Sequence, residues 1–440
     1  MASELRVNTI NSRSGLGTIT VSDTGAVFTG ITTIGSVTVD GGTVTGNLTG
    51  TASTATASAT AYGLSGSPTL TGITSVSTTN LTVNGNAYPA AGPLSNRNLI
   101  INGAMQVAQR GTSSTSSDFR TVDRFFYNFG NTLAGTQSQQ TLSSGTPYNE
   151  GFRNFYRFAI STPGSATSTY CQLIQGIEAQ NLATSGWQYT SADSDITVSF
   201  WVRSSVAQTF YGTLKSSDGT TRNYVFSFAL SADTWTKVTK TIPGNTNVQI
   251  DNDNGQGAQL IIYPFMGTNY SDSSVNVDAW QAYSGSTRIP DMATDWVLTN
   301  GATFDVTGVQ LEVGSVATPF EHRSYGDEFQ RCCRYYQRLE GRSGQDGDIC
   351  ISAFYTTTNA YGPIYFPNGN MRTYPTVNII DNAITFYYPG NADASLGFFV
   401  GGIHLERIAL NVQNVSGSAG DSGFLRLLTS ADVFEFSAEL

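Results

Sequence analysis

The stretch that decides the fold reads Ile196-Thr-Val-Ser-Phe-Trp-Val-Arg203. From Ile196 to Val202 every second residue is a large apolar one, and Thr, Ser and Trp stand between them. Successive side chains of a strand point to opposite faces, so this period of two predicts a strand with one face on a core. Trp201 falls on the other face. There its ring is either exposed for stacking or packed in a subunit interface.

The surrounding sequence repeats this pattern. Tyr224, Phe226 and Phe228 alternate along a second predicted strand, and Asp218-Gly219 between the two strands indicates a hairpin turn. Further strands are predicted at residues 235–242, 259–263 and 303–313. Because residues 96–323 contain no convincing long helix, they predict an antiparallel jelly-roll β-sandwich, and the chain as a whole is predicted to be all-β.

A segment of small residues lies upstream of the predicted sandwich. Residues 41–62 read GGTVTGNLTGTASTATASATAY, with only Val44 and Leu48 as sizeable apolar side chains. Such a segment cannot repay its ordering entropy alone, so it is either a flexible linker or ordered by copies of itself. Recurring β-branched residues on both flanks favour an intertwined, multi-chain stalk over residues 31–95. Residues 1–30 would then form an attachment segment.

Composition excludes several classes of function. Charged residues make up only 12% of the 440 residues, and the net charge is −10. There is no basic run, so a nucleic-acid partner is not expected. The chain has no apolar run of membrane-spanning length. Its four cysteines are too irregularly spaced for a disulfide framework or a zinc site, so we expect free thiols in a protein assembled in a cytosol, with no metal and no cofactor.

Residues 324–340 break the β pattern and predict a short helix. Phe329, Cys333 and Tyr336 recur at helical spacing, with acids in the first turn and arginines later. Such a helix is marginal in isolation, so we expect it to pack on a domain or at a trimer axis. Adjacent residues on a helix face different directions, so Cys332 and Cys333 are interpreted as small buried side chains.

The remaining residues, 341–440, predict a compact β tip domain. Sugars bind to flat apolar faces beside hydrogen-bonding amides, because sugar C–H groups stack on aromatic rings. The tip offers tyrosines close in sequence to asparagines such as Asn359 and Asn368. Core packing is the alternative role for these tyrosines. The candidate receptor-binding residues are Trp201, Tyr361, Tyr365, Tyr374 and Tyr387.

Three motifs suggest chemistry, and each has a simpler interpretation. Gly420-Asp-Ser-Gly423 matches a protease nucleophile motif, but the chain has only two histidines, so we interpret it as a turn before a strand. Asp251-Asn-Asp-Asn-Gly255 resembles a calcium loop, but Ile262 stands where the bidentate acid should be, which favours a plain turn. A pair of glycan-cleaving carboxylates cannot be identified from sequence, and we expect no catalytic residues.

Several segments, taken in order, resemble bacteriophage tail fibre proteins, especially those of tailed phages of marine bacteria. Ser3-Glu-Leu-Arg-Val-Asn-Thr-Ile10 and Gly46-Asn-Leu-Thr-Gly50 resemble fibre repeats. Residues 98–105 and 122–125 resemble the start of a fibre jelly-roll domain, and residues 306–323 with Cys333-Arg-Tyr-Tyr336 resemble its end. Met371-Arg-Thr-Tyr-Pro-Thr-Val377 and Phe436-Ser-Ala-Glu-Leu440 resemble fibre C-termini.

This resemblance implies a virion structural protein assembled in the host cytoplasm. It implies a homotrimer that is bound through residues 1–30 to a tail or portal-proximal adaptor protein. Its receptor would be a bacterial surface glycan or outer-membrane receptor, held by many weak contacts. Two alternatives stay open. One is a capsid-attached decoration fibre, and the other is a carbohydrate-active enzyme, a depolymerase, with a jelly-roll binding module.

Overall fold

A computed structural model describes residues 81–83, 86–88, 96–341, 347–380 and 383–440. The chain divides into two units, Met1–Val76 and Ser77–Leu440, and all described residues belong to the second. The predicted attachment segment and nearly all of the predicted stalk lie outside the described residues. From the end of the stalk, β1 (Leu81–Val83) and β2 (Asn86–Tyr88) are described, and they pair antiparallel.

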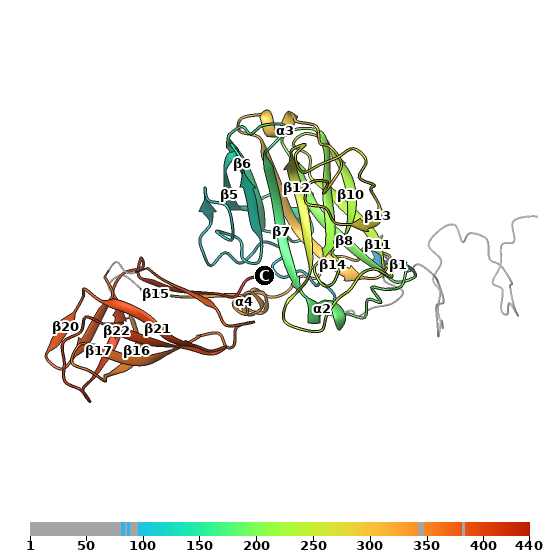
Figure 1. Ribbon diagram of the computed structural model, residues 1–440. Helices are drawn as coiled ribbons and strands as arrows, with labels where there is room; N and C mark the ends of the chain where they lie inside the picture. The colour runs from blue at the N-terminus through green and yellow to red at the C-terminus, as the bar shows by residue number, and fades with distance from the viewer. Residues whose placement is uncertain (1–80, 84–85, 89–95, 342–346, 381–382) are drawn as a thin grey trace, which may run out of the picture. The chain divides into compact units, whose positions relative to one another are not determined.

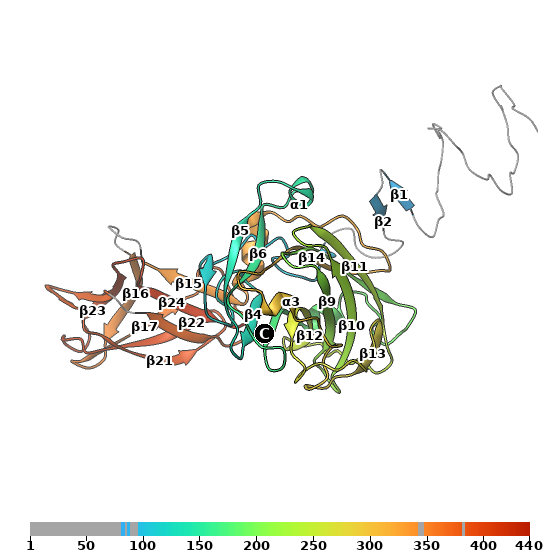
Figure 2. The ribbon, with the colours of Figure 1, turned by 90° about the horizontal axis from the view of Figure 1, so that it is seen from above.

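Two six-stranded antiparallel sheets form the larger domain (Figures 1 and 2). The first sheet has the order β13-β10-β9-β12-β7-β4, and the second has the order β11-β8-β14-β6-β5-β3. The strands of the first sheet are β4 (Phe126–Gly130), β7 (Tyr170–Glu178), β9 (Gln208–Ser216), β10 (Arg222–Leu230), β12 (Gln256–Met266) and β13 (Ala279–Ala282). The strands of the second sheet are β3 (Ser113–Ser114), β5 (Ala134–Thr141), β6 (Asn154–Thr162), β8 (Asp195–Ser204), β11 (Thr236–Pro243) and β14 (Thr303–Val313).

The chain crosses repeatedly between these sheets, for example from β7 to β8, from β8 to β9 and from β10 to β11. Such crossing is typical of jelly-roll sandwiches. It confirms the predicted all-β, sandwich-like class, and the predicted strands at residues 235–242, 259–263 and 303–313 correspond to β11, β12 and β14. Short helices interrupt the strands, namely α1 (Thr146–Asn149), α2 (Ala179–Ala183) and α3 (Asp295–Leu298).

The core of the sandwich lies between the two sheets, as the alternation in β8 predicts. Ile196, Val198 and Phe200 are fully buried there. Phe200 contacts Phe228 edge to face across the core, with ring centroids 5.5 Å apart. Burying a side chain of this size stabilises the fold by about 1.5–3 kcal/mol. The first sheet supplies the facing residues from β9, β10 and β12.

The predicted hairpin at Asp218-Gly219 exists but joins different strands from those expected. β9 and β10 pair through it, whereas β8 lies in the other sheet beside β11 and β14. Strand β9 lies in the sequence between the two strands that the pattern paired. The alternation of apolar and polar residues in β9 is weaker, because one of its inward positions is Gly212 rather than a large apolar residue. The Phe226 ring fills the space beside Gly212.

Residues 336–440 form a second β domain with two sheets around one core (Figure 2). The larger sheet has the order β20-β19-β23-β16-β17-β22-β21 and the smaller one β15-β24-β18. The larger sheet contains β16 (Gly347–Phe354), β17 (Asn359–Tyr365), β19 (Thr385–Tyr388), β20 (Asn391–Asp393), β21 (Gly397–Ile403), β22 (Arg407–Gln413) and β23 (Ser422–Leu427). The smaller one contains β15 (Tyr336–Glu340), β18 (Thr376–Ile380) and β24 (Val433–Ser437).

The helix predicted over residues 324–340 is shorter in the structure. Helix α4 spans Tyr325–Cys333, and Tyr336 begins strand β15, which pairs with β24. Cys333 and Tyr336 are buried within this chain, at 0% and 2% exposure. Neither is therefore exposed for a trimer axis, and Phe329 is half-buried on the helix beside Tyr325. The predicted burial of both Cys332 and Cys333 is confirmed.

A buried polar network connects the residues after α4 to the sandwich. Glu178, at the end of β7, accepts hydrogen bonds from Arg334 at 2.7 and 2.9 Å and from the Tyr335 hydroxyl at 2.5 Å. The Arg124 guanidinium lies 3.4 Å from the centre of the Tyr335 ring and pairs with Glu439. Buried charges are tolerated only when paired in this way.

Candidate functional site: an aromatic face on the C-terminal sheet

The larger sheet of the C-terminal domain packs only one of its faces on the core. Along β17, Ala360 and Ile364 point inward and are fully buried, whereas Tyr361 and Tyr365 point outward and are exposed. The same alternation holds along β22, where Ile408 and the following alternate residues are buried. The opposite face therefore carries large side chains in contact with solvent.

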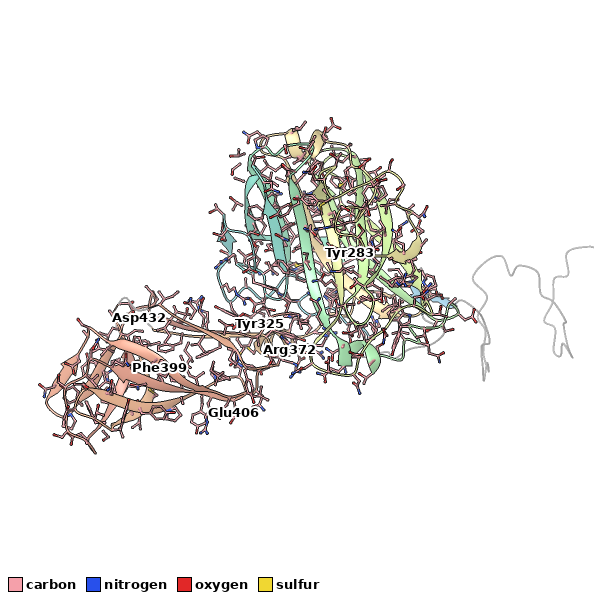
Figure 3. The ribbon with its side chains drawn as sticks, viewed as in Figure 1. Tyr283, Tyr325, Arg372, Phe399, Glu406 and Asp432 are labelled. Carbon is pink, nitrogen blue, oxygen red and sulfur yellow. The ribbon has the colours of Figure 1, made fainter. Side chains whose placement is uncertain are left out.

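We call this outward surface the aromatic face. Its large exposed side chains have exposures between 47% and 76%. Large exposed apolar patches on a folded domain mark interaction sites. The members are Ile351, Tyr355, Tyr361, Tyr365 and Phe399. Figure 3 labels Phe399 on β21.

Backbone pairing fixes the positions of these side chains. One row crosses four strands, because Tyr361 pairs with both Ala353 and Asn411, and Asn411 pairs with Phe399. Residues paired across antiparallel strands lie about 5 Å apart. The Tyr361 and Phe399 side chains are thus held on a rigid sheet with the Asn411 amide between them.

Polar groups accompany the rings. The Asn411 amide Nδ2 donates to the Tyr355 hydroxyl at 2.5 Å, and the Tyr355 ring meets the Tyr361 ring edge to face at 6.4 Å. The Arg407 guanidinium lies 5.8 Å from the centre of the Tyr365 ring and donates to its hydroxyl at 3.3 Å. Rings with an amide and a guanidinium beside them supply both the flat surface and the directional donors that a saccharide requires.

A second aromatic group lies on the same sheet at β19 and β23. The Tyr387 and Phe424 rings stack with centroids 5.5 Å apart and an interplanar angle of 13°. The Arg426 guanidinium lies 4.7 and 4.9 Å from their centres and is held by Asp348 at 2.7 Å. Beside these rings is an open pocket of about 480 Å³ lined by Ile351, Tyr387, Tyr388, Pro389, Ser422, Gly423 and Phe424.

The predicted site residues fall into three groups. Tyr361 and Tyr365 lie on the aromatic face, and Tyr387 lies on the same sheet but is half-buried in its stack with Phe424. Tyr374 is 66% exposed, but it precedes β18 of the smaller sheet. Sequence reasoning missed Ile351, Tyr355 and Phe399. The period of two in residues 351–365 was the signal that could have found Ile351 and the outward tyrosines.

Trp201 is not exposed for stacking. Its side chain is 6% exposed, and its Nε1 donates to a Glu150 carboxylate oxygen at 3.0 Å. The Lys237 ammonium lies 5.7 Å from the ring centre and pairs with the same carboxylate at 3.2 Å. This face of β8 is covered by the chain itself, so Trp201 does not belong to the candidate site.

The two sequence motifs that suggested chemistry lie in local turns. Ser422 is the first residue of β23 and follows a turn in which Gly420 has a φ of 97°, as expected for a turn before a strand. In the acidic loop, the Asp253 carboxylate accepts from the Gly255 amide at 2.8 Å, which closes a local turn. Among the described residues, no group of three or more His, Cys, Asp or Glu side chains could hold a metal.

No protein-family model and no curated protein matches this sequence. Among solved structures, a CBM4 chain is 13% identical with a TM-score of 0.26, and 48% of this chain aligns with 97% of that one. The CBM22-1 xylan-binding domain from Paenibacillus barcinonensis is 9% identical with a TM-score of 0.22, covering 48% of this chain and 99% of that chain.

A family 16 carbohydrate binding module is 8% identical with a TM-score of 0.20, covering 41% of this chain and 86% of that chain. TM-scores in this range are too low to assign a ligand to this chain. Within the part of the chain that the structure describes, no helix has the length and apolar composition needed to cross a bilayer.

Proposed function

We propose that this protein is a non-enzymatic attachment protein that binds a bacterial surface glycan through the aromatic face. The observation that carries this proposal is the row of exposed rings around Tyr361, held on a sheet with the Asn411 amide and the Arg407 guanidinium beside them. Such a surface suits weak, repeated contacts with a polymer rather than enclosure of a small molecule.

The wider setting that we propose is a bacteriophage tail fibre in the virion. Residues 1–30 would bind a tail or portal-proximal adaptor, residues 31–95 would form the stalk, and three chains would present three aromatic faces. Linking three weak sites raises the effective concentration of each, which supplies avidity without any single tight site. The sequence resemblance and the small-residue segment at 41–62 support this setting.

A screen of full-length protein against immobilised bacterial surface polysaccharides tests the proposal. We expect binding to at least one saccharide, with no release of reducing ends during incubation. Release of reducing ends would favour the carbohydrate-active enzyme instead. Absence of binding to every saccharide, at concentrations where trimeric avidity operates, would contradict a glycan receptor.

A second outcome would assign the aromatic face differently. Ile351 and Phe399 are apolar and exposed at 76% and 59%, as subunit interfaces also are before assembly. If Phe399→Ser changes the oligomeric state and leaves saccharide binding intact, this face packs against a second copy of the chain. We expect the reverse result, with an unchanged oligomer and weaker binding.

A further inference from the structure

A row of polar side chains crosses the outer face of the first sandwich sheet, far in sequence from the aromatic face. Asn223 of β10 pairs with Gln281 of β13 on one side and with Lys215 of β9 on the other. Lys215 in turn pairs with Gln259 of β12. We call these four residues the Lys215 row. Their neighbours Tyr224, Leu214 and Leu260 point the other way, into the core.

The next row on the same face is mostly apolar, with Thr213 between Val225 and Ile261, and it is covered. Val225 and Ile261 are buried under the segment that follows β12, which contributes Ile289 and the half-buried Tyr270. The cover stops at the Lys215 row, where Lys215, Gln259 and Gln281 are only half-buried. Lys215, Gln259 and Gln281 are therefore reachable from solvent, whereas Asn223 is buried beside them.

Two cations converge at this edge. The Lys215 ammonium donates to the Gln259 amide oxygen at 3.1 Å and lies 4.6 Å from the centre of the Tyr283 ring, and Figure 3 labels Tyr283 on the sandwich. The Arg288 guanidinium donates to the Gly285 carbonyl at 2.9 Å and lies 5.2 Å from the centre of the Tyr270 ring. Burial, together with the charge of Arg288, lowers the pKa of Lys215.

Within the described part of the chain, neither cation has an acidic partner. Among the described residues, no carboxylate forms an ion pair with Lys215 or Arg288, although the chain carries 32 acidic residues and a net charge of −10. Two half-buried like charges repel each other, and an anion between them would offset that repulsion. The arrangement therefore favours an anionic ligand.

Asn223 adds an independent observation. Its side chain is 1% exposed, and its amide Nδ2 donates to the Arg288 carbonyl at 3.1 Å, which holds the Arg288 segment against β10. Its Oδ1 has no hydrogen-bond partner among the described residues. A buried acceptor without a partner is unfavourable, and a small shift of this side chain that brings a water or a ligand hydroxyl to Oδ1 would satisfy it.

We propose that Lys215, Arg288 and Asn223 form a second binding site, for an acidic saccharide. A carboxylate or sulfate group would lie between the two cations, and a hydroxyl would donate toward Asn223 Oδ1. The site uses no residue of the aromatic face, so it stands or fails independently of the proposed function.

Isothermal titration of the full-length protein tests this site. The probes are polygalacturonate oligosaccharides for the carboxylate, carrageenan oligosaccharides for the sulfate and cellohexaose as a neutral control. We expect at least one acidic probe to bind and cellohexaose not to bind at this site. Since hydrogen bonds to charged groups are among the stronger ones, Lys215→Gln and Arg288→Gln should each weaken binding about tenfold or more.

Lys237→Gln is the matched control, because it removes the same charge from β11 of the opposite sheet. It should leave the affinity within about twofold. Thermal unfolding of each variant shows whether it is folded, and Lys215→Arg, which keeps the charge, should retain binding. The site is overturned if no acidic probe binds, if Lys215→Gln and Arg288→Gln bind as tightly as the wild type, or if Tyr361→Ala abolishes the same binding.

Discussion

At the scale of single residues, Glu178 shows how this chain holds a buried charge. Its side chain is 1% exposed, and burial alone would raise its pKa. The hydrogen bonds from Arg334 and Tyr335 outweigh burial and hold the pKa of Glu178 below its ordinary value. The carboxylate is therefore ionised in the folded protein, and it joins β7 to the residues that follow α4.

This lowered pKa predicts a pH dependence of stability. A carboxyl with a lower pKa in the folded state stabilises the fold above its unfolded pKa of about 4.3, and that stability is lost as the pH falls through the folded pKa. Removing the charge with Glu178→Gln should lower the Tm at pH 7 and flatten its decline below pH 4.5. Glu406 is exposed, so the control variant Glu406→Gln should leave the pH dependence of the Tm unchanged. If the Tm of the wild type and that of Glu178→Gln changed with pH in the same way, the ionised Glu178 carboxylate would not stabilise the fold as predicted.

The four cysteines allow a second prediction at this scale. All four are free thiols, as the sequence predicted. Burial raises the pKa of Cys333 to about 12 and raises the pKa values of Cys171, Cys332 and Cys350 as well. Because the thiolate is the reactive form, none of the four should react with a thiol reagent within minutes at pH 8, and all four should react after unfolding. Rapid titration of two or more thiols in the folded protein would show that this packing is wrong.

Residue patterns also show how much of the site the sequence could predict. The outward positions of Tyr361 and Tyr365 follow from the period of two in β17. Trp201 obeys the same rule on β8, yet both faces of that strand are covered. The alternation of a strand indicates which residues share a face, but only tertiary packing decides whether a second layer covers that face.

At the scale of elements, α4 and β15 show where local pattern and tertiary pairing compete. The periodicity through Phe329, Cys333 and Tyr336 favours a helix to residue 340, but Tyr336 pairs with Ser437 in a strand instead. Aromatic residues favour strands, and a partner strand almost a hundred residues away in sequence is not visible to a local pattern. The start of α4 was predictable because the acids of its first turn are a local signal.

The cap of α4 provides a test. The Ser324 hydroxyl oxygen accepts from the Asp327 amide at 3.1 Å and donates to the Asp327 carboxylate at 2.6 Å. Ser324→Ala should lower the free energy of unfolding by about 1 kcal/mol, whereas Ser324→Asp should restore most of it. Chemical denaturation measures both. If Ser324→Ala and Ser324→Asp lowered the free energy of unfolding equally, the Ser324 hydroxyl would not act as a helix cap.

At the scale of the whole molecule, the proposed trimer is a prediction of the small-residue segment at 41–62. Native mass spectrometry of the full-length protein should give about 141 kDa, three times the chain mass of 46.9 kDa. Deleting residues 1–95 should weaken or abolish the trimer, because the stalk would be its main contact. A stable monomer of the full-length protein would contradict the fibre.

The larger architecture was predictable to different degrees. The all-β class and the strands at β11, β12 and β14 follow from alternation, which each strand carries in its own sequence. The partner of β8 and the sharing of one core by two C-terminal sheets depend on contacts between distant segments. Those contacts set the outward direction of the aromatic face, so its full extent required the structure.

The most direct test of the aromatic face is the affinity of the full-length protein for the saccharide that binds best in the screen. Each stacked ring contributes about 0.5–1.5 kcal/mol, so the double variant Tyr361→Ala/Tyr365→Ala should lose about tenfold in affinity, or more. Tyr374→Ala, which removes a more exposed tyrosine outside this face, should stay within about twofold of the wild type. Equal affinities for the double variant and Tyr374→Ala, with both proteins folded, would contradict the aromatic face as the glycan site.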